Sequence, residues 1–144
     1  MIKKRIMVSG GFDPLHIGHI KMIESASQLG NVIVVINSDE WLIRKKGYAF
    51  MPWKERAEIM GNIKGVTLVT SVNDTDGTVC EALIHHKPDM FANGGDRTEN
   101  NTPETELCNF LDIEVLWGMG GTDKPQSSSW LVNKAMEQLN EIKQ

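Results

Sequence analysis

The sequence predicts an α/β fold with a five-stranded parallel sheet and helices on both of its faces. Apolar strand-like runs alternate with helical patterns along the chain, and no repeat or linker interrupts them. The runs are short and continuous, which is typical of strands buried on both faces. Alternating strands and helices imply right-handed crossovers that cover both sides of the sheet. The length of 144 residues fits one domain, which we place over residues 1–144.

Five apolar runs are the predicted strands. They cover residues 5–9, 32–37, 66–70, 90–92 and 113–117. In such a sheet, ligands bind at the carboxyl ends of the strands, near the point where the strand order reverses. Three of the five runs are followed by residues that could bind a ligand or take part in catalysis, so we expect a functional site at that edge.

Helical patterns fill the intervals between these runs. The first covers residues 18–29 with Gly30 as its stop, and the second covers residues 52–62 with proline in its first turn. The last covers residues 128–143 and carries one apolar stripe at near-helical spacing. The stripe consists of Leu131, Ala135, Leu139 and Ile142.

Two shorter helices are predicted between the third and fifth strands. One ends at His86, and either Asp76 or Thr78 caps its start. The other opens at Thr102, which is followed by proline. With these two helices, a predicted helix follows each of the five predicted strands.

Composition excludes several classes of protein. The chain is 40% hydrophobic and 24% charged, unlike a disordered chain. Its longest apolar run, residues 32–36, is far shorter than the ~20 residues of a membrane span. The net charge of −4 gives no basic field for nucleic acid. The first residues lack the apolar core of a signal peptide, so we expect a cytoplasmic protein whose Cys80 and Cys108 are inert thiols.

The most informative segment follows the first strand and reads SGGFDPLHIGHI, residues 9–20. Gly10 and Gly11 permit a tight turn and a close approach of backbone N–H groups to a ligand. His16 and His19 lie three residues apart at a helix start, so their rings share one face. Gly18 leaves the helix N-terminus open to phosphate. These groups together suit a triphosphate. No third ligand at useful spacing completes a zinc site with His16 and His19, so we predict no metal ligand among these histidines.

Four segments of the chain resemble one superfamily of nucleotidyltransferases. GFDPLHIGH resembles its (T/G)xFDxxHxGH signature, which glycerol-phosphate cytidylyltransferases, heptose-phosphate adenylyltransferases, pantetheine-phosphate adenylyltransferase and archaeal FAD synthetases share. INSDEWLIRKKG, FANGGDR and KPQSSSW resemble its later segments. The resemblance implies a Rossmann-like, doubly wound domain. It also implies transfer of a nucleotidyl group to a phosphate, with release of pyrophosphate.

The resemblance also implies roles for single residues. His16 and His19 would contact the α-phosphate or its bridging oxygens, and Lys46, or else Lys45, would neutralise phosphate charge. We expect His19 to act on the reaction rather than on folding, because a helix-start imidazole beside glycines has little to pack against. The residues implied to bind the nucleotide are Gly10, Gly11, Phe12, Asp13, Gly18, Asp96, Lys124, Ser127, Ser128 and Ser129.

Asp39 and Arg56 are implied to bind the second substrate, with the Arg56 guanidinium anchoring the phosphate of the acceptor. Asp13 either fixes the turn or orients a magnesium ion, and the residues leave this open. One departure concerns residues 122–126, where the cytidylyltransferases carry an Arg-Thr-x-Gly run. Lys124 would replace the missing arginine charge.

The implied reaction joins a nucleoside triphosphate to a sugar phosphate or polyol phosphate and uses Mg²⁺. The GGDRTENN loop and the missing Arg-Thr-x-Gly run favour ATP over CTP. Two alternatives stay open: a coenzyme-type adenylyltransferase acting on pantetheine phosphate or a flavin, and a non-catalytic nucleotide-binding module. We also expect a homodimer, since four tryptophans and eight methionines are many for one small core.

Overall fold

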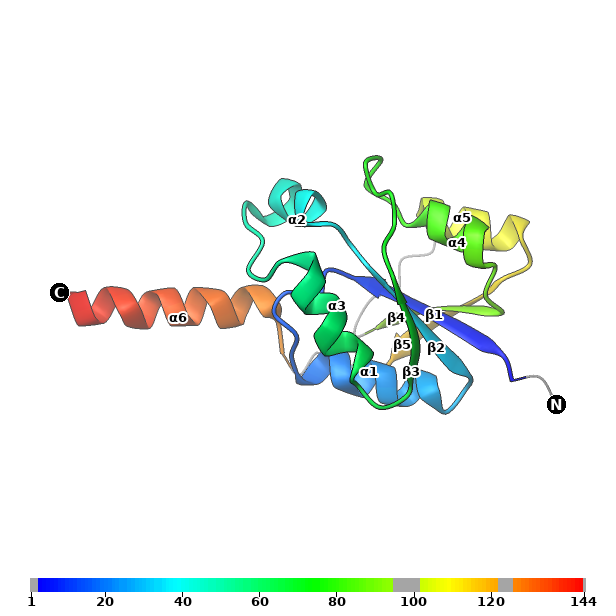
Figure 1. The fold of residues 1–144 in the computed structure, drawn as a ribbon, viewed down its shortest axis with the longest axis horizontal. Coiled ribbons are helices and arrows are strands. Elements are labelled where there is room, and N and C mark those ends of the chain that lie inside the picture. Colours follow the sequence, from blue (N-terminus) through cyan, green and yellow to red (C-terminus); the bar gives the residue numbers. More distant parts are fainter. Residues whose placement is uncertain (1–2, 95–101, 122–125, 144) are drawn as a thin grey trace.

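The computed structural model describes residues 3–94, 102–121 and 126–143 (Figure 1). Strands and helices alternate along the chain. The strands are β1 (Arg5–Gly10), β2 (Asn31–Ile36), β3 (Val66–Thr70), β4 (Met90–Gly94) and β5 (Glu114–Met119). The helices are α1 (Ile17–Ser27), α2 (Asp39–Lys46), α3 (Trp53–Gly61), α4 (Cys80–His86), α5 (Pro103–Phe110) and α6 (Ser128–Lys143).

The five strands form one parallel sheet in the order β3-β2-β1-β4-β5. The chain runs outward from β1 through β2 to β3 and then returns to place β4 on the other side of β1. The strand order therefore reverses between β1 and β4, which is where doubly wound sheets bind their ligands. This confirms the predicted fold class.

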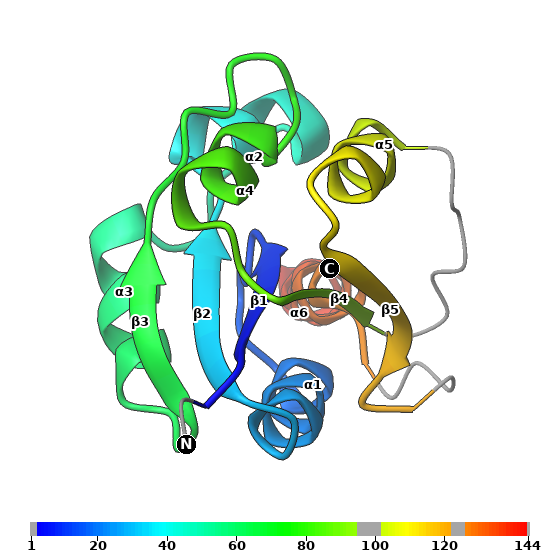
Figure 2. The same ribbon diagram turned by 90° about the vertical axis from the view of Figure 1, so that its right-hand side faces the viewer.

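Helices pack on both faces of the sheet, and Figure 2 shows α4 and α5 on one side and α1 on the other. One core lies between the sheet and α1 and α3, and it contains Ile6, Val8, Ile23 and Met60. A second core lies between the sheet and α4 and α5, and it contains Met7, Leu83, Phe91 and Cys108. Successive residues of β1 therefore point into different cores, as the period of a strand requires.

The predicted strands are found, with ends that shift by one or two residues. The helix α2 was not predicted, although its signals are present: Ser38 caps it, Asp39 and Glu40 occupy its first turn, and Gly47 ends it in the left-handed conformation. At only eight residues, the helix is too short and too polar for its apolar spacing to stand out.

Two of the predicted helix boundaries are wrong. Gly30 is not the stop of α1, which ends at Ser27; a Cβ at Gly30 would lie 2.3 Å from the carbonyl oxygen of Lys4, so glycine serves a close backbone approach. Neither Asp76 nor Thr78 is the cap of α4. That position is Val79, and the two polar side chains build the turn before it.

The last helix differs from the others in having no buried residue. It extends away from the sheet (Figure 1), and Trp130, Met136, Leu139 and Ile142 are exposed along it. None of the helices in the described ranges is long and apolar enough to cross a membrane.

Candidate active site

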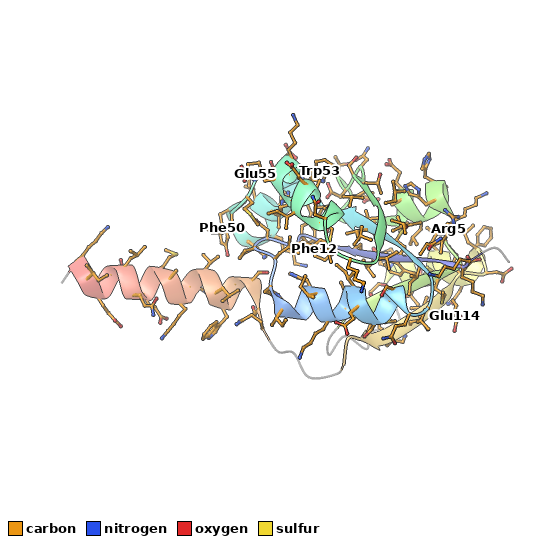
Figure 3. All side chains as sticks on the ribbon, turned by 60° about the horizontal axis from the view of Figure 1, so that its bottom comes forward. Arg5, Phe12, Phe50, Trp53, Glu55 and Glu114 are labelled. Atoms are coloured by element: carbon orange, nitrogen blue, oxygen red, sulfur yellow. The ribbon has the colours of Figure 1, made fainter. Side chains whose placement is uncertain are left out.

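The loop after β1 lies at the reversal point of the sheet and carries the signature residues. Figure 3 shows Phe12 and Phe50 at the end of the sheet where α6 begins, and Arg5 and Glu114 at the opposite end. The loop, residues 11–16, thus lies at the carboxyl edge where a ligand was expected. Residues from α1, α2, α3 and α6 contact it.

His16 and His19 form a reciprocal cap at the start of α1. The Nδ1 atom of His16 accepts the backbone N–H of Gly18 at 3.0 Å, and Nδ1 of His19 accepts the backbone N–H of His16 at 3.2 Å. The rings stack with their centroids 3.8 Å apart. Because each Nδ1 accepts a hydrogen bond, the proton of each neutral ring is on Nε2. Both rings therefore have Nε2–H as their donor.

This cap corrects the expectation that His19 contributes little to folding. Its ring satisfies a backbone N–H that the first turn of the helix leaves unpaired. It also meets the edge of Phe12, with the ring centroids 4.9 Å apart. The stabilisation by a capping side chain is about 1 kcal/mol, so His19 has a folding role beside any catalytic one.

Asp13 holds the loop in place. Its carboxylate has no exposed surface and accepts the backbone N–H groups of Phe50 and Met51. The preceding residue, Phe12, is buried in the left-handed conformation, with φ of 52°. Of the two roles left open for Asp13, the contacts favour fixing the turn.

Lys46 reaches this loop from the last turn of α2. Its ammonium lies 3.3 Å from the backbone oxygen of Asp13. Lys45 points elsewhere, with its ammonium over the ring of Trp41 at 4.7 Å from the centroid. The structure therefore brings Lys46, the first choice of the two, to the signature loop.

The serine cluster reaches the same loop from α6. Ser128 donates its hydroxyl to the backbone oxygen of Pro14 at 2.7 Å. Ser127 accepts the backbone N–H of Trp130 in the first turn of the helix, and Ser129 follows in that turn. The start of α6 is thus joined to the start of the loop that leads into α1.

The two helices that meet at this loop differ from the rest in charge. The first turns of α1 and α6 contain no acidic residue. Each first turn of α2, α3, α4 and α5 contains at least one. An acidic residue there offsets the partial positive charge of a helix N-terminus. The loop is therefore reached by two helix N-termini whose positive charge is not offset in this way, which favours an anion.

Arg56 does not lie where the sequence placed it. Its side chain has no exposed surface, so an incoming acceptor phosphate cannot reach the guanidinium. The nitrogen atoms donate instead to the backbone oxygens of Met51, Gly11 and Asn37 at 2.7–2.9 Å and to the Asp39 carboxylate. Arg56 thus holds together the segments around the site.

Asp39 has two environments. One oxygen pairs with Arg56, while the side chain keeps 36% of its surface exposed. That surface lines a pocket of about 290 Å³ at the carboxyl ends of β2 and β3. The pocket is lined by Ser38, Asp39, Glu40, Trp53, Ser71 and Val72.

Two predicted site residues, Asp96 and Lys124, lie outside the described residues.

Within the described ranges, no three His, Cys, Asp or Glu side chains are grouped to hold a metal ion. Burial raises the pKa of the Cys108 thiol to about 11, with smaller effects from Cys80 and Glu104. Cys108 is therefore a neutral thiol of the core.

A family model described as "Cytidylyltransferase-like" matches residues 7–132, which include the signature loop, Lys46, Arg56 and the serine cluster. The chain belongs to the cytidylyltransferase-like family. This membership confirms the superfamily to which the signature loop and the three later segments pointed.

Curated proteins of the cytidylyltransferase-like family match over most of the chain. The bifunctional protein HldE of Desulfatibacillum aliphaticivorans is 36% identical over 83% of this chain, which spans 23% of that protein. The glycerol-3-phosphate cytidylyltransferase of Bacillus subtilis is 35% identical over 65% of this chain and 72% of its own. The FAD synthase of Korarchaeum cryptofilum is 35% identical over 78% of this chain and 80% of its own.

A solved structure shares the cytidylyltransferase-like fold. The lipopolysaccharide core biosynthesis protein of Thermoplasma volcanium superposes with a TM-score of 0.65 at 24% identity. The superposition covers 80% of this chain and 95% of that one. This likeness supports the fold.

The burial of Arg56 predicts a large loss of stability for Arg56→Met. The apolar side chain keeps the length but leaves three backbone oxygens and Asp39 without their donor. We expect the free energy of unfolding to fall by about 3 kcal/mol or more, measured by denaturant titration.

Lys54→Met is the matched control for this variant, since Lys54 is an exposed cation of the same helix. Its free energy of unfolding should change by less than about 0.5 kcal/mol. An Arg56→Met protein of normal stability with a raised KM for the acceptor phosphate would contradict this prediction. It would support the role of Arg56 in binding the acceptor instead.

Proposed function

We propose that this protein is a cytoplasmic enzyme that transfers a nucleotidyl group from a nucleoside triphosphate to a sugar phosphate or polyol phosphate. The main support is the stacked His16–His19 pair, which caps α1 at a loop that Lys46 and the start of α6 also contact. Nε2–H donors, an ammonium group and two helix N-termini together suit a polyphosphate. One of the relatives named above is a glycerol-3-phosphate cytidylyltransferase, whose name describes a transfer of this kind.

The proposed step is an in-line displacement at the α-phosphorus. An oxygen of the acceptor phosphate supplies the electron pair for the new P–O bond. The bond from the α-phosphorus to the bridging oxygen breaks, and its electron pair leaves with pyrophosphate. The acceptor phosphate is already ionised near neutral pH, so no residue has to remove a proton from it. Catalysis then consists of positioning and charge stabilisation.

Each group near the loop has a part in this proposal. His16 and His19 donate from Nε2 to phosphate oxygens as negative charge moves toward pyrophosphate. Lys46 neutralises charge on the same oxygens. Ser127, Ser128 and Ser129 present the start of α6 to the β- and γ-phosphates.

Magnesium is proposed to enter with the triphosphate. The Asp13 carboxylate is buried and already accepts two backbone N–H groups, so it does not suit a metal ligand. Mg²⁺ commonly keeps several waters and is held by substrate phosphates. When bound in this way it would supply positive charge to the polyphosphate.

The acceptor is proposed to place its hydroxyl groups near Asp39. The pocket that Asp39 lines is also lined by two serines and a tryptophan. Carboxylate and hydroxyl groups pair with sugar or polyol hydroxyls, and an indole ring covers their apolar face. A flavin is the second candidate acceptor, favoured by the similarity to an FAD synthase over 80% of that protein.

A screen for pyrophosphate release tests this proposal. Four nucleoside triphosphates are each combined with sugar phosphates, polyol phosphates, pantetheine phosphate and FMN. We expect turnover with a sugar or polyol phosphate and with ATP in preference to CTP. Turnover with FMN alone would support the flavin alternative, and nucleotide binding without any turnover would support a non-catalytic module.

The cap geometry allows the catalytic role of His19 to be separated from its folding role. In His19→Asn, the side-chain oxygen can occupy the position of Nδ1 and still accept the N–H of His16, but the Nε2–H donor is lost. We expect kcat to fall by about a hundredfold or more, with the nucleotide KM much less changed. His19→Ala should lose as much turnover and a further ~1 kcal/mol of stability.

Steady-state kinetics and thermal unfolding of the two His19 variants check this expectation. His85→Asn is a suitable control, because His85 is exposed in the last turn of α4. That turn lies beside the start of β1, whereas the signature loop follows the end of β1. If His19→Asn turns over normally, the proposed mechanism is wrong whatever the substrate.

The homodimer remains a prediction, now supported by the exposed apolar side chains of α6. Light scattering should then give about twice the monomer mass of 16.1 kDa. Leu139→Glu should lower that mass toward the monomer, whereas Asn140→Glu, on the neighbouring position of the same helix, should not. A wild-type mass of one chain at working concentration would contradict the prediction.

A further inference from the structure

The carboxylate of Asp74 binds the junction between β2 and α2. Asp74 is only 3% exposed, and it follows β3 rather than any signature segment. One oxygen accepts the side-chain N–H of Asn37 at 3.1 Å and the backbone N–H of Ser38 at 2.9 Å; the other accepts the Ser38 hydroxyl at 2.7 Å. Burial acts to raise the pKa of Asp74, but these hydrogen bonds outweigh it and lower the pKa, so the group is an anion at neutral pH.

Through Ser38, this carboxylate sets the cap of α2. The Ser38 hydroxyl donates its proton to Asp74 and accepts the backbone N–H of Trp41 at 3.0 Å. Because the Ser38 hydroxyl donates its proton to the Asp74 carboxylate, a lone pair of the Ser38 oxygen points to the N–H of Trp41. Arg44, near the end of α2, donates to the backbone oxygen of Asp74 at 2.8 Å. Both ends of α2 are thus tied to one residue.

Besides these contacts, Arg56 pairs with Asp39 in the first turn of α2, but the helix itself is short and little buried. It has eight residues, of which only Leu42 is buried, and a helix of this length is unstable in isolation. Yet it packs closely on the signature loop, since a Cβ at Gly11 would lie 2.7 Å from the Leu42 side chain. Its last residue is Lys46, whose ammonium contacts that loop at Asp13. A shift of α2 would therefore move Lys46 relative to the loop.

We propose that Asp74 is a positioning residue for Lys46, acting through the Ser38 cap and the Arg44 contact that hold α2. This inference rests on the proposed function, because that function gives Lys46 a negative charge to stabilise. Asp74 does not touch substrate. It places the ammonium where negative charge develops.

The test is a double-mutant cycle in the full chain, with Asp74→Ala, Lys46→Ala and the double variant. Removing the carboxylate leaves the N–H groups of Asn37 and Ser38 unpaired and the cap hydroxyl undirected. We expect Asp74→Ala alone to lower kcat about tenfold or more, with a smaller change in nucleotide KM. In the Lys46→Ala background, Asp74→Ala should lower kcat less than twofold further. Independent, multiplicative effects of the two substitutions would overturn the proposal.

Two variants separate positioning from general damage to the fold. Asp76→Ala removes an exposed carboxylate of the same loop that accepts only from Thr78 among the contacts described, and it should keep wild-type kcat. Asp74→Asn keeps the size and one acceptor oxygen, so it should restore most of the turnover lost in Asp74→Ala. If Asp74→Ala does not fold, the cycle is run with Arg44→Ala, which removes the other contact by which Asp74 holds α2, and coupling to Lys46→Ala is again the deciding result.

The same measurements distinguish this inference from the proposed function. If Lys46→Ala turns over like the wild type, the charge-neutralising role of Lys46 is wrong, and the positioning role fails with it. If Lys46→Ala is impaired and Asp74→Ala is impaired by the same factor in both backgrounds, the enzyme proposal stands and only the positioning role is overturned.

Discussion

The architecture of the site depends on one buried guanidinium. At the carboxyl edge of a parallel sheet, the chain leaves each strand with a backbone oxygen that needs a donor. Arg56 pairs two such oxygens, in the segments after β1 and β2, together with a backbone oxygen in the turn before α3 and one oxygen of Asp39. Arginine has five donors in a fixed planar fork and keeps its charge when buried, so one side chain can do this. Remote segments thereby become one scaffold.

Charge is distributed over the helices in a way that suits this scaffold. Where helices serve only to pack, acidic residues in the first turn offset the dipole, as in α4 and α5. At α1 and α6 such residues are missing, and the first turn of α1 is satisfied by imidazole instead. A neutral acceptor caps the helix without opposing a bound anion. Under the proposed function, these two helix N-termini are the ones that face the polyphosphate.

The sequence was sufficient to predict the strands, the sheet type and the signature loop, because buried parallel strands and a helix-start His pair have strong local patterns. It was not sufficient for α2 or for the roles of Arg56 and Asp74. A guanidinium on a helix has the same local pattern whether it meets ligand or backbone, and its burial here depends on segments 5, 19 and 45 residues away. Asp74 lies 36 residues from Ser38. Such contacts arise only once the sheet has formed.

The signature histidines illustrate how folding and chemistry are divided within one side chain. Nδ1 of each ring is used by the fold, as an acceptor for a backbone N–H of the loop and first turn. That hydrogen bond fixes the tautomer and limits rotation of the ring, so Nε2–H has a defined direction. Under the proposed function, a donor held in this way would lose little entropy on binding a phosphate oxygen. Under the same function, the cap that stabilises α1 thus also prepares the donor, so the same two rings serve folding through Nδ1 and chemistry through Nε2.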